Sequence, residues 1–122
     1  MHNTAQEDAN NDLLQAARTG KLAEVKHALQ SGARINKTDT AGNSALLIAA
    51  RRGDEKMFAY LIDQKAAVEF WNDAGNDALM EALEARQEKI AKRCLSLPFN
   101  LAAANEAGKT SYLLAAEKNM PK

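Results

Sequence analysis

The feature that most constrains this chain is an internal repeat with a period of 33 residues. Gly42, Gly75 and Gly108 are each 33 residues apart, and each follows an alanine. An Asp or Asn stands three residues before each glycine, and a Ser, Asp or Thr stands two residues after it. A fixed period of this length indicates a repeat array, in which stacked copies bury a core that no single copy can bury.

Each copy contains a turn, a first helix, a second helix and an extended return. The turn is predicted by the D-x-x-G or N-x-x-G spacing, because Asp or Asn bonds its own loop backbone and glycine adopts positive φ. Ser44, Asp77 and Thr110 are N-cap residue types, so each is expected to begin a first helix. Helical spacing of apolar residues predicts the second helices, with Gly32 and Pro98 as helix-ending residues. These second helices are expected in residues 21–32, 54–65 and 87–98.

The period, the loops and the Ala-Ala-x-x-Gly helix endings at residues 16–20 and 49–53 resemble the ankyrin repeat. The resemblance extends over residues 11–122 and implies an all-α fold. That fold is an ankyrin-repeat solenoid of about four stacked helix-turn-helix repeats with hairpin loops and a truncated last repeat. We expect a polar N-terminal lead-in over residues 1–10, followed by repeats at about residues 11–41, 42–74, 75–107 and 108–122.

The third copy departs most from its neighbours. Leu83 stands where the family places alanine, which predicts that its two helices either move apart or repack. Arg86 replaces the glycine that usually caps the first helix. Glu81 occupies a position that is apolar in the neighbouring copies. We expect its carboxylate to reach solvent, and the alternative is an ion pair with Arg51 or Arg52.

Cysteine and histidine offer little for metal binding or nucleophilic chemistry. Cys94 is the single cysteine and lies in register with Leu61 and Ala28, which predicts a buried thiol in the core. His2 and His27 are far apart in the sequence and are expected to be solvent-exposed. We therefore predict no metal site.

An enzyme needs convergent groups in a pocket, and the repeating glycines read as turns rather than as a phosphate cradle. The one arrangement that could hold a carboxylate pair is Glu81, Glu84 and Glu88. The simpler interpretation of these three residues is a solvated helix face. We therefore predict that the chain is not an enzyme and that it uses no cofactor.

The charge balance and the hydropathy pattern restrict the partners and the compartment. Sixteen basic residues balance sixteen acidic ones, so there is no basic excess for nucleic acid. No apolar run approaches the roughly 20 residues of a membrane span, so no membrane association is expected. The first residues contain no apolar signal-peptide core. We expect a cytoplasmic protein if the chain begins at its natural start, and a periplasmic or secreted one if a signal peptide has been removed.

The resemblance implies a non-catalytic protein–protein interaction module, because ankyrin-repeat proteins usually hold a partner protein with their hairpin tips and first helices. Trp71 at a tip predicts an interface anchor, unless its ring folds against the neighbouring hairpin. The first-helix charges run from basic at Arg18 to acidic at Glu84, which would orient a partner. Carried over by register, the expected binding residues are Arg18, Thr38, Thr40, Asn43, Arg51, Arg52, Trp71, Asp73, Asn76, Glu84, Glu106 and Lys109.

Two alternative roles stay open at this point. A dedicated inhibitor or immunity protein of one enzyme or toxin would bind a single partner very tightly. An end-to-end assembly module would self-associate through its last helix, where Leu113 and Leu114 have no second helix to cover them. Because this last helix is expected to be under-covered, either the natural chain is longer or this edge meets another molecule.

Overall fold

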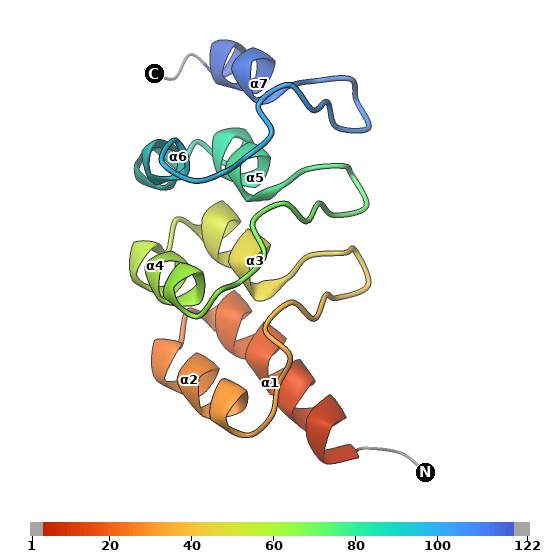
Figure 1. Cartoon of the computed structure of the whole chain (residues 1–122), viewed down its shortest axis with the longest axis vertical. Helices are drawn as coiled ribbons and strands as arrows, with labels where there is room; N and C mark the ends of the chain where they lie inside the picture. Colours follow the sequence, from red (N-terminus) through yellow and green to blue (C-terminus); the bar gives the residue numbers. More distant parts are fainter. Residues whose placement is uncertain (1–3, 119–122) are drawn as a thin grey trace.

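The computed structural model describes residues 4–118, which form seven helices. In Figure 1 the first helices of successive repeats stack in one column and the second helices stack beside them, while the loops between repeats project together on the other side. This arrangement confirms the all-α repeat solenoid. Thr38 and Ser44 form an isolated antiparallel β-bridge across the first loop. The helices are α1 (Thr4–Thr19), α2 (Leu22–Gln30), α3 (Ala45–Arg52), α4 (Glu55–Asp63), α5 (Ala78–Glu84), α6 (Glu88–Cys94) and α7 (Ser111–Glu117).

The loops between repeats are closed by the side chains that the spacing predicted. Asp39 Oδ1 accepts hydrogen bonds from the backbone amides of Ala41 and Asn43, both at 2.9 Å. The carboxamide oxygens of Asn72 and Asn105 accept the equivalent pairs of bonds in the next two loops. One polar side chain therefore satisfies two backbone amides in each of these three loops.

Neighbouring hairpin tips are joined by backbone hydrogen bonds. The amide of Asp73 donates to the carbonyl of Ala41 at 3.0 Å, and the amide of Glu106 donates to the carbonyl of Ala74 at 2.8 Å. Gly42 has φ +83°, and a Cβ at this position would lie 3.0 Å from the backbone nitrogen of Asp73. Glycine is needed here both for the left-handed backbone and for the close approach of the next tip.

The first helices α3, α5 and α7 begin at the predicted caps. Ser44, Asp77 and Thr110 each have an extended backbone and accept a hydrogen bond from the amide three residues later. The donor–acceptor distances are 3.4, 2.9 and 3.3 Å. Each cap satisfies one of the amides that the first turn of a helix leaves without an internal partner.

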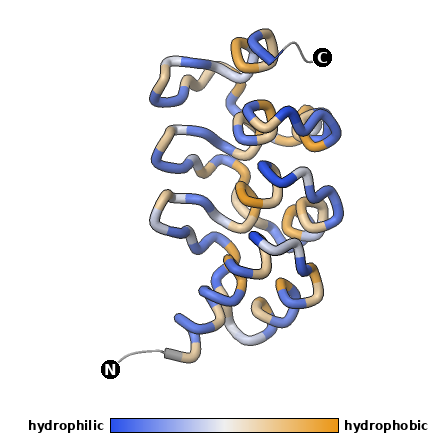
Figure 2. Tube along the Cα trace, turned by 180° about the vertical axis from the view of Figure 1, so that it is seen from behind, coloured by the Kyte–Doolittle hydropathy of each residue, from blue (hydrophilic) through white to orange (hydrophobic). Residues whose placement is uncertain are grey.

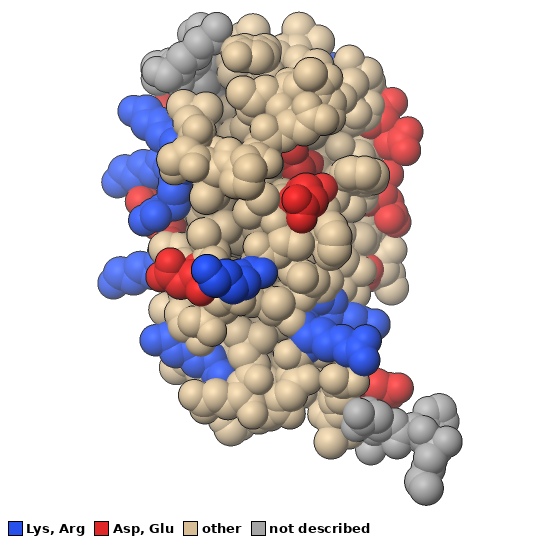
Figure 3. All heavy atoms as spheres, in the orientation of Figure 1, with Lys and Arg blue, Asp and Glu red and all other residues tan. Residues whose placement is uncertain are grey.

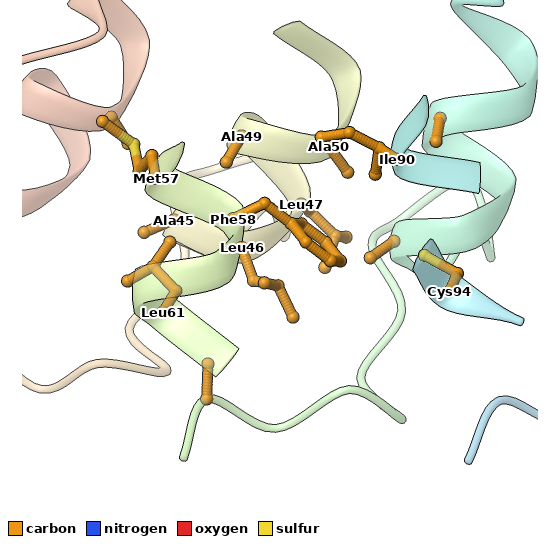
Figure 4. Packing of buried hydrophobic residues seen from close by; sticks show 14 of the residues in the cluster. Ala45, Leu46, Leu47, Ala49, Ala50, Met57, Phe58, Leu61, Ile90 and Cys94 are labelled. Carbon is orange, nitrogen blue, oxygen red and sulfur yellow. The ribbon is translucent and has the colours of Figure 1, made fainter. Parts of the chain in front are cut away.

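The hydrophobic core runs continuously through the repeats. Figure 4 shows the ring of Phe58 in α4 pointing toward the next repeat, where Ile90 and Cys94 of α6 lie. Leu46 and Leu79 occupy equivalent positions in α3 and α5 and are both buried. In Figure 2 the hairpin loops are mostly hydrophilic, whereas hydrophobic residues gather in the helices. The apolar area removed from water by stacking is the main source of stability in such an array.

Leu83 is accommodated without separation of the two helices of its repeat. Its side chain is buried, although the equivalent residue of the preceding repeat is Ala50. In the second helix of the same repeat, Ala91 stands at the position that Phe58 fills in the preceding one. Leu83 and Ala91 both belong to the core, and α5 and α6 remain packed against each other. Of the two outcomes that the sequence left open, the structure favours repacking.

The last helix is only partly uncovered. Leu113 is 46% exposed, as expected, but Leu114 is 0% exposed and belongs to the core. The expectation that Leu114 lies under-covered is therefore wrong, because α7 packs against α5 and buries this side chain between them. Only one side of α7 is left to solvent.

The first helix is longer than the repeat alone requires. It begins at Thr4, so the residues that we expected as a polar lead-in are largely helical. Ala9 and Asn10 are buried, and Asn10 Oδ1 accepts a hydrogen bond from the amide of Arg34 at 2.7 Å. His2 lies outside the described residues. Within residues 4–118, no helix has the length and apolar character needed to cross a membrane.

Arg86 adopts a backbone conformation that favours glycine. Its φ is +61°, close to the +75° of Gly20 and Gly53, which follow the first helices of the two preceding repeats. A left-handed conformation costs a residue with a Cβ about 1–2 kcal/mol. The fold thus imposes the same helix ending on all three repeats, although only two of them carry the residue suited to it.

Replacing Arg86 by glycine is expected to stabilise the protein. The relief of the left-handed strain is partly offset by the greater freedom of glycine in the unfolded chain, so we expect a gain of about 0.5–1 kcal/mol. The free energy of unfolding in urea measures this gain. Arg93→Gly, at an exposed position inside α6, is the matched control and should lose about 1 kcal/mol. Destabilisation by both substitutions would contradict the strain at Arg86.

Candidate interaction surface

The predicted binding residues lie along the first helices and the hairpin tips, which form neighbouring parts of one side of the solenoid (Figure 1). Most of them are accessible. Asn43, Glu84 and Lys109 are half-buried, and Asn76 is buried. The exposed ones are Arg18, Thr38, Thr40, Arg51, Arg52, Trp71, Asp73 and Glu106.

Trp71 is the most exposed large apolar side chain among the described residues. It is 70% exposed, and the adjacent Phe70 is 45% exposed. The alternative in which the indole ring folds against the neighbouring hairpin is therefore not what the structure shows. An indole in this position has a large apolar area that a partner can cover, and a polar N–H at its edge.

Glu81 is buried, and our expectation that it reaches solvent is wrong. Its side chain is 6% exposed. Oε1 accepts a hydrogen bond from Arg51 Nη1 at 3.1 Å, as the alternative predicted. Oε2 accepts from the carboxamide nitrogens of Asn76 at 2.8 Å and Asn72 at 3.1 Å. A carboxylate can remain buried when donors satisfy both of its oxygens, and these three donors do so.

The asparagines around Glu81 connect one loop to the next. Asn72 Nδ2 donates to Asn43 Oδ1, and Asn105 Nδ2 donates to Asn76 Oδ1, both at 2.8 Å. Asn76 is therefore an internal link between repeats and is not offered to a partner, contrary to its expected place on the tip. The available signal was the recurrence of Asn at equivalent loop positions in successive copies. In the sequence alone, that recurrence predicts residues that stabilise turns and does not show that they bond to the neighbouring loop.

The charge gradient along the first helices is partly neutralised by local ion pairs. Arg18 pairs with Asp39 at 3.4 Å, and Glu84 pairs with Lys118 at 3.9 Å. Burial tends to raise the pKa of Asp39, but hydrogen bonds from two loop amides and from the guanidinium of Arg18 lower it overall. At the other end, a hydrogen bond to Glu117 raises the pKa of Lys109. The charges at both ends of the gradient thus sit in local ion pairs.

Charge also differs between the two edges of the solenoid. In Figure 3, Lys and Arg side chains gather along the edge of the second helices, whereas Asp and Glu side chains lie along the upper hairpins. Exposed Asp73 and Glu106 belong to those hairpins. A partner approaching the upper tips therefore meets a different field from one approaching the second helices.

Burial shifts the pKa values of two ionisable side chains, Cys94 and Asp77. Cys94 is 1% exposed, and burial together with the charge of Asp77 raises the pKa of its thiol to about 12. The thiol stays protonated near neutral pH, as expected of a core cysteine. Burial also raises the pKa of Asp77, outweighing the helix amides that donate to it. His27 is exposed, as predicted.

The carboxylates of α5 are held by basic side chains. Glu81 is bonded to Arg51, and Glu84 is paired with Lys118. Among residues 4–118, no group of three or more His, Cys, Asp or Glu side chains is placed to hold a metal ion.

The comparisons agree with the repeat seen in the sequence and in the structure. A family model described as "Ankyrin repeats (3 copies)" matches residues 13–105. The matched region extends from α1 to the third hairpin loop and includes the turns at Gly42 and Gly75. No curated protein matches the chain.

Removal of the Glu81 carboxylate is expected to destabilise the array. Glu81→Ala leaves the buried carboxamide N–H of Asn76 without its acceptor, which should cost about 1–3 kcal/mol of unfolding free energy. Glu84→Ala, one turn later in the same helix, removes only a partly exposed ion pair and should cost less than about 1 kcal/mol. Chemical denaturation of both variants measures the difference. Equal losses would contradict a structural role for the Glu81 carboxylate.

Proposed function

Because this chain belongs to the ankyrin-repeat family, we propose that it is a non-catalytic module that binds a partner protein through its hairpin tips and the exposed face of its first helices. Repeat solenoids present an extended surface of this kind, on a scaffold whose repeats contact only their neighbours. The observation that carries the proposal is the exposure of Trp71 next to that surface. Exposed aromatic and arginine side chains are the commonest anchors of protein interfaces.

Three features support binding without large rearrangement. The hairpin tips are joined to one another by backbone hydrogen bonds. The asparagine side chains link each of the last two loops to the loop before it. Arg51 is held in place by Glu81, which is itself fixed by the loops. A preorganised surface loses little conformational entropy when a partner binds.

The proposal is tested by capture from a lysate of the source cells, followed by mass spectrometry. Trp71→Ala and, separately, Arg52→Glu should reduce recovery of the partner by about tenfold or more, as expected for interface anchors. The wild type and Arg93→Glu, which changes an exposed residue of the second-helix edge, should recover it equally. Circular dichroism verifies that each variant remains helical. Equal recovery by all folded variants would place the binding surface elsewhere.

Self-association through the C-terminal end is a second candidate function, and one observation favours it. Tyr112 and Leu113 are 59% and 46% exposed, whereas the equivalent residues of α5, Leu79 and Met80, are buried. These two side chains occupy positions that face the core in the earlier repeats. A second copy of the chain could cover them end to end.

Leu113→Glu tests this second function, because Leu114 is buried and its replacement would disturb the fold. If the ends associate, the wild type should show a mass that rises with concentration in analytical ultracentrifugation, and Leu113→Glu should remain monomeric. Trp71→Ala, which removes an exposed apolar residue at a distant tip, should behave as the wild type. A wild-type chain that is monomeric throughout the concentration series would exclude end-to-end association.

A further inference from the structure

A small pocket lies between the first helices of three successive repeats. It has a volume of about 150 Å³ and is lined by residues of α1, α3 and α5 together with Asn43 of the first hairpin loop. Leu47, which is almost fully buried, and half-buried Ile48 provide apolar walls. The charged side chains that line it are Arg18, Arg51, Arg52 and Glu81. The pocket thus combines an apolar wall with a charged rim.

The charge at this rim is predominantly positive. Three guanidinium groups line the pocket, against the single carboxylate of Glu81. Arg51 is bonded to that carboxylate, and Arg18 is paired with Asp39. Arg52 donates through Nη1 to the backbone carbonyl of Arg18 at 2.8 Å, and within residues 4–118 it forms no ion pair with a carboxylate. The electrostatic character of the rim therefore favours an anionic group.

The guanidinium groups are both held in place and able to donate further. Each guanidinium has five N–H donors, of which these contacts use only one or two. A planar guanidinium pairs with a carboxylate through two parallel hydrogen bonds, and little side-chain entropy is lost when it is already fixed. Arg51 is fixed through Glu81, whose second oxygen is bonded to Asn72 and Asn76.

The volume of the pocket suits one side chain. Drug-sized ligands occupy pockets of roughly 300–1,000 Å³, about twice the volume of this one or more. A glutamate side chain has two parts that match this pocket, an apolar stem and a carboxylate. Its methylene groups would contact Leu47 and Ile48, and its carboxylate would reach the guanidinium rim.

We propose that this pocket, called here the arginine pocket, receives a glutamate side chain of the partner protein, an inference that rests on the proposed function. The partner segment is then acidic at this contact. The arginine pocket selects for charge, and exposed Trp71 of the second hairpin is a separate apolar contact of the proposed binding surface.

The test uses the full-length chain labelled with ¹⁵N and an acetylated, amidated Leu-Glu-Leu peptide, whose only charge is the glutamate carboxylate. The matched peptide is Leu-Gln-Leu with the same blocked ends. The expected result is movement of the arginine Nε–Hε signals of Arg18, Arg51 and Arg52 with the glutamate peptide alone, at millimolar concentrations, with a response that weakens as salt is added. Movement of these signals by both peptides alike, or by neither, would overturn the proposal.

Two variants of the chain localise the response. Arg52→Gln should weaken binding of the glutamate peptide about tenfold, because a charge-assisted hydrogen bond is lost. Arg93→Gln, on the second-helix edge, should bind as the wild type does. Arg51 is left intact because its replacement would also disturb the bond to Glu81. An equal loss in both variants would mean that the peptide responds to the overall charge of the protein, and it would overturn the proposal that the arginine pocket binds the glutamate.

This experiment is separable from the test of the proposed function. If the peptide fails while Trp71→Ala still loses the captured partner, the interaction module stands and the arginine pocket does not. If Trp71→Ala and Arg52→Glu both retain the captured partner, the proposed binding surface fails, whatever the peptide does.

Discussion

The contact of each repeat with the next is the constraint on which the rest of the structure depends. A pair of short helices cannot bury its apolar residues alone, so each repeat completes its core against a neighbour. The same stacking fixes the spacing of the hairpin tips, where the amide of Asp73 donates to Ala41 and that of Glu106 donates to Ala74. The same stacking of one repeat on the next therefore positions both the hydrophobic core and the row of hairpin tips. A surface that extends over several repeats follows from it.

The buried carboxylate of Glu81 adds a polar element to this stacking. It is bonded to Arg51 of the preceding first helix and to Asn72 and Asn76 of its own loop. The asparagines continue these contacts to the loops on either side. The network crosses the repeat boundaries, so it couples the position of a surface arginine to the geometry of the loops. A charge that departs from the repeat pattern thus connects the scaffold to its candidate binding surface.

The third repeat shows how far the sequence pattern can be predictive. A comparison of the copies in the sequence is enough to show that Leu83 and Arg86 depart from the repeat pattern. Their consequences are seen only in the structure: Leu83 is buried in the core, and the helix ending shared with the preceding repeats places Arg86 in a left-handed conformation. For Glu81 the general tendency of carboxylates to face water predicted exposure. That prediction was wrong, because three donors from two repeats converge on one carboxylate.

The sequence by itself determined the period and the all-α repeat class, because equivalent residues recur at a fixed spacing along the chain. It determined the turns and the helix caps because each depends on residues close together in one copy. Asp39 closes its own loop, and Ser44 caps the helix that directly follows it. It also indicated that the single cysteine is a core residue. Only the tertiary structure decided that Asn76 is internal, that Trp71 is exposed and that three arginines share one pocket. These outcomes depend on side chains about one period apart or more, whose meeting is set by the stacking of repeats.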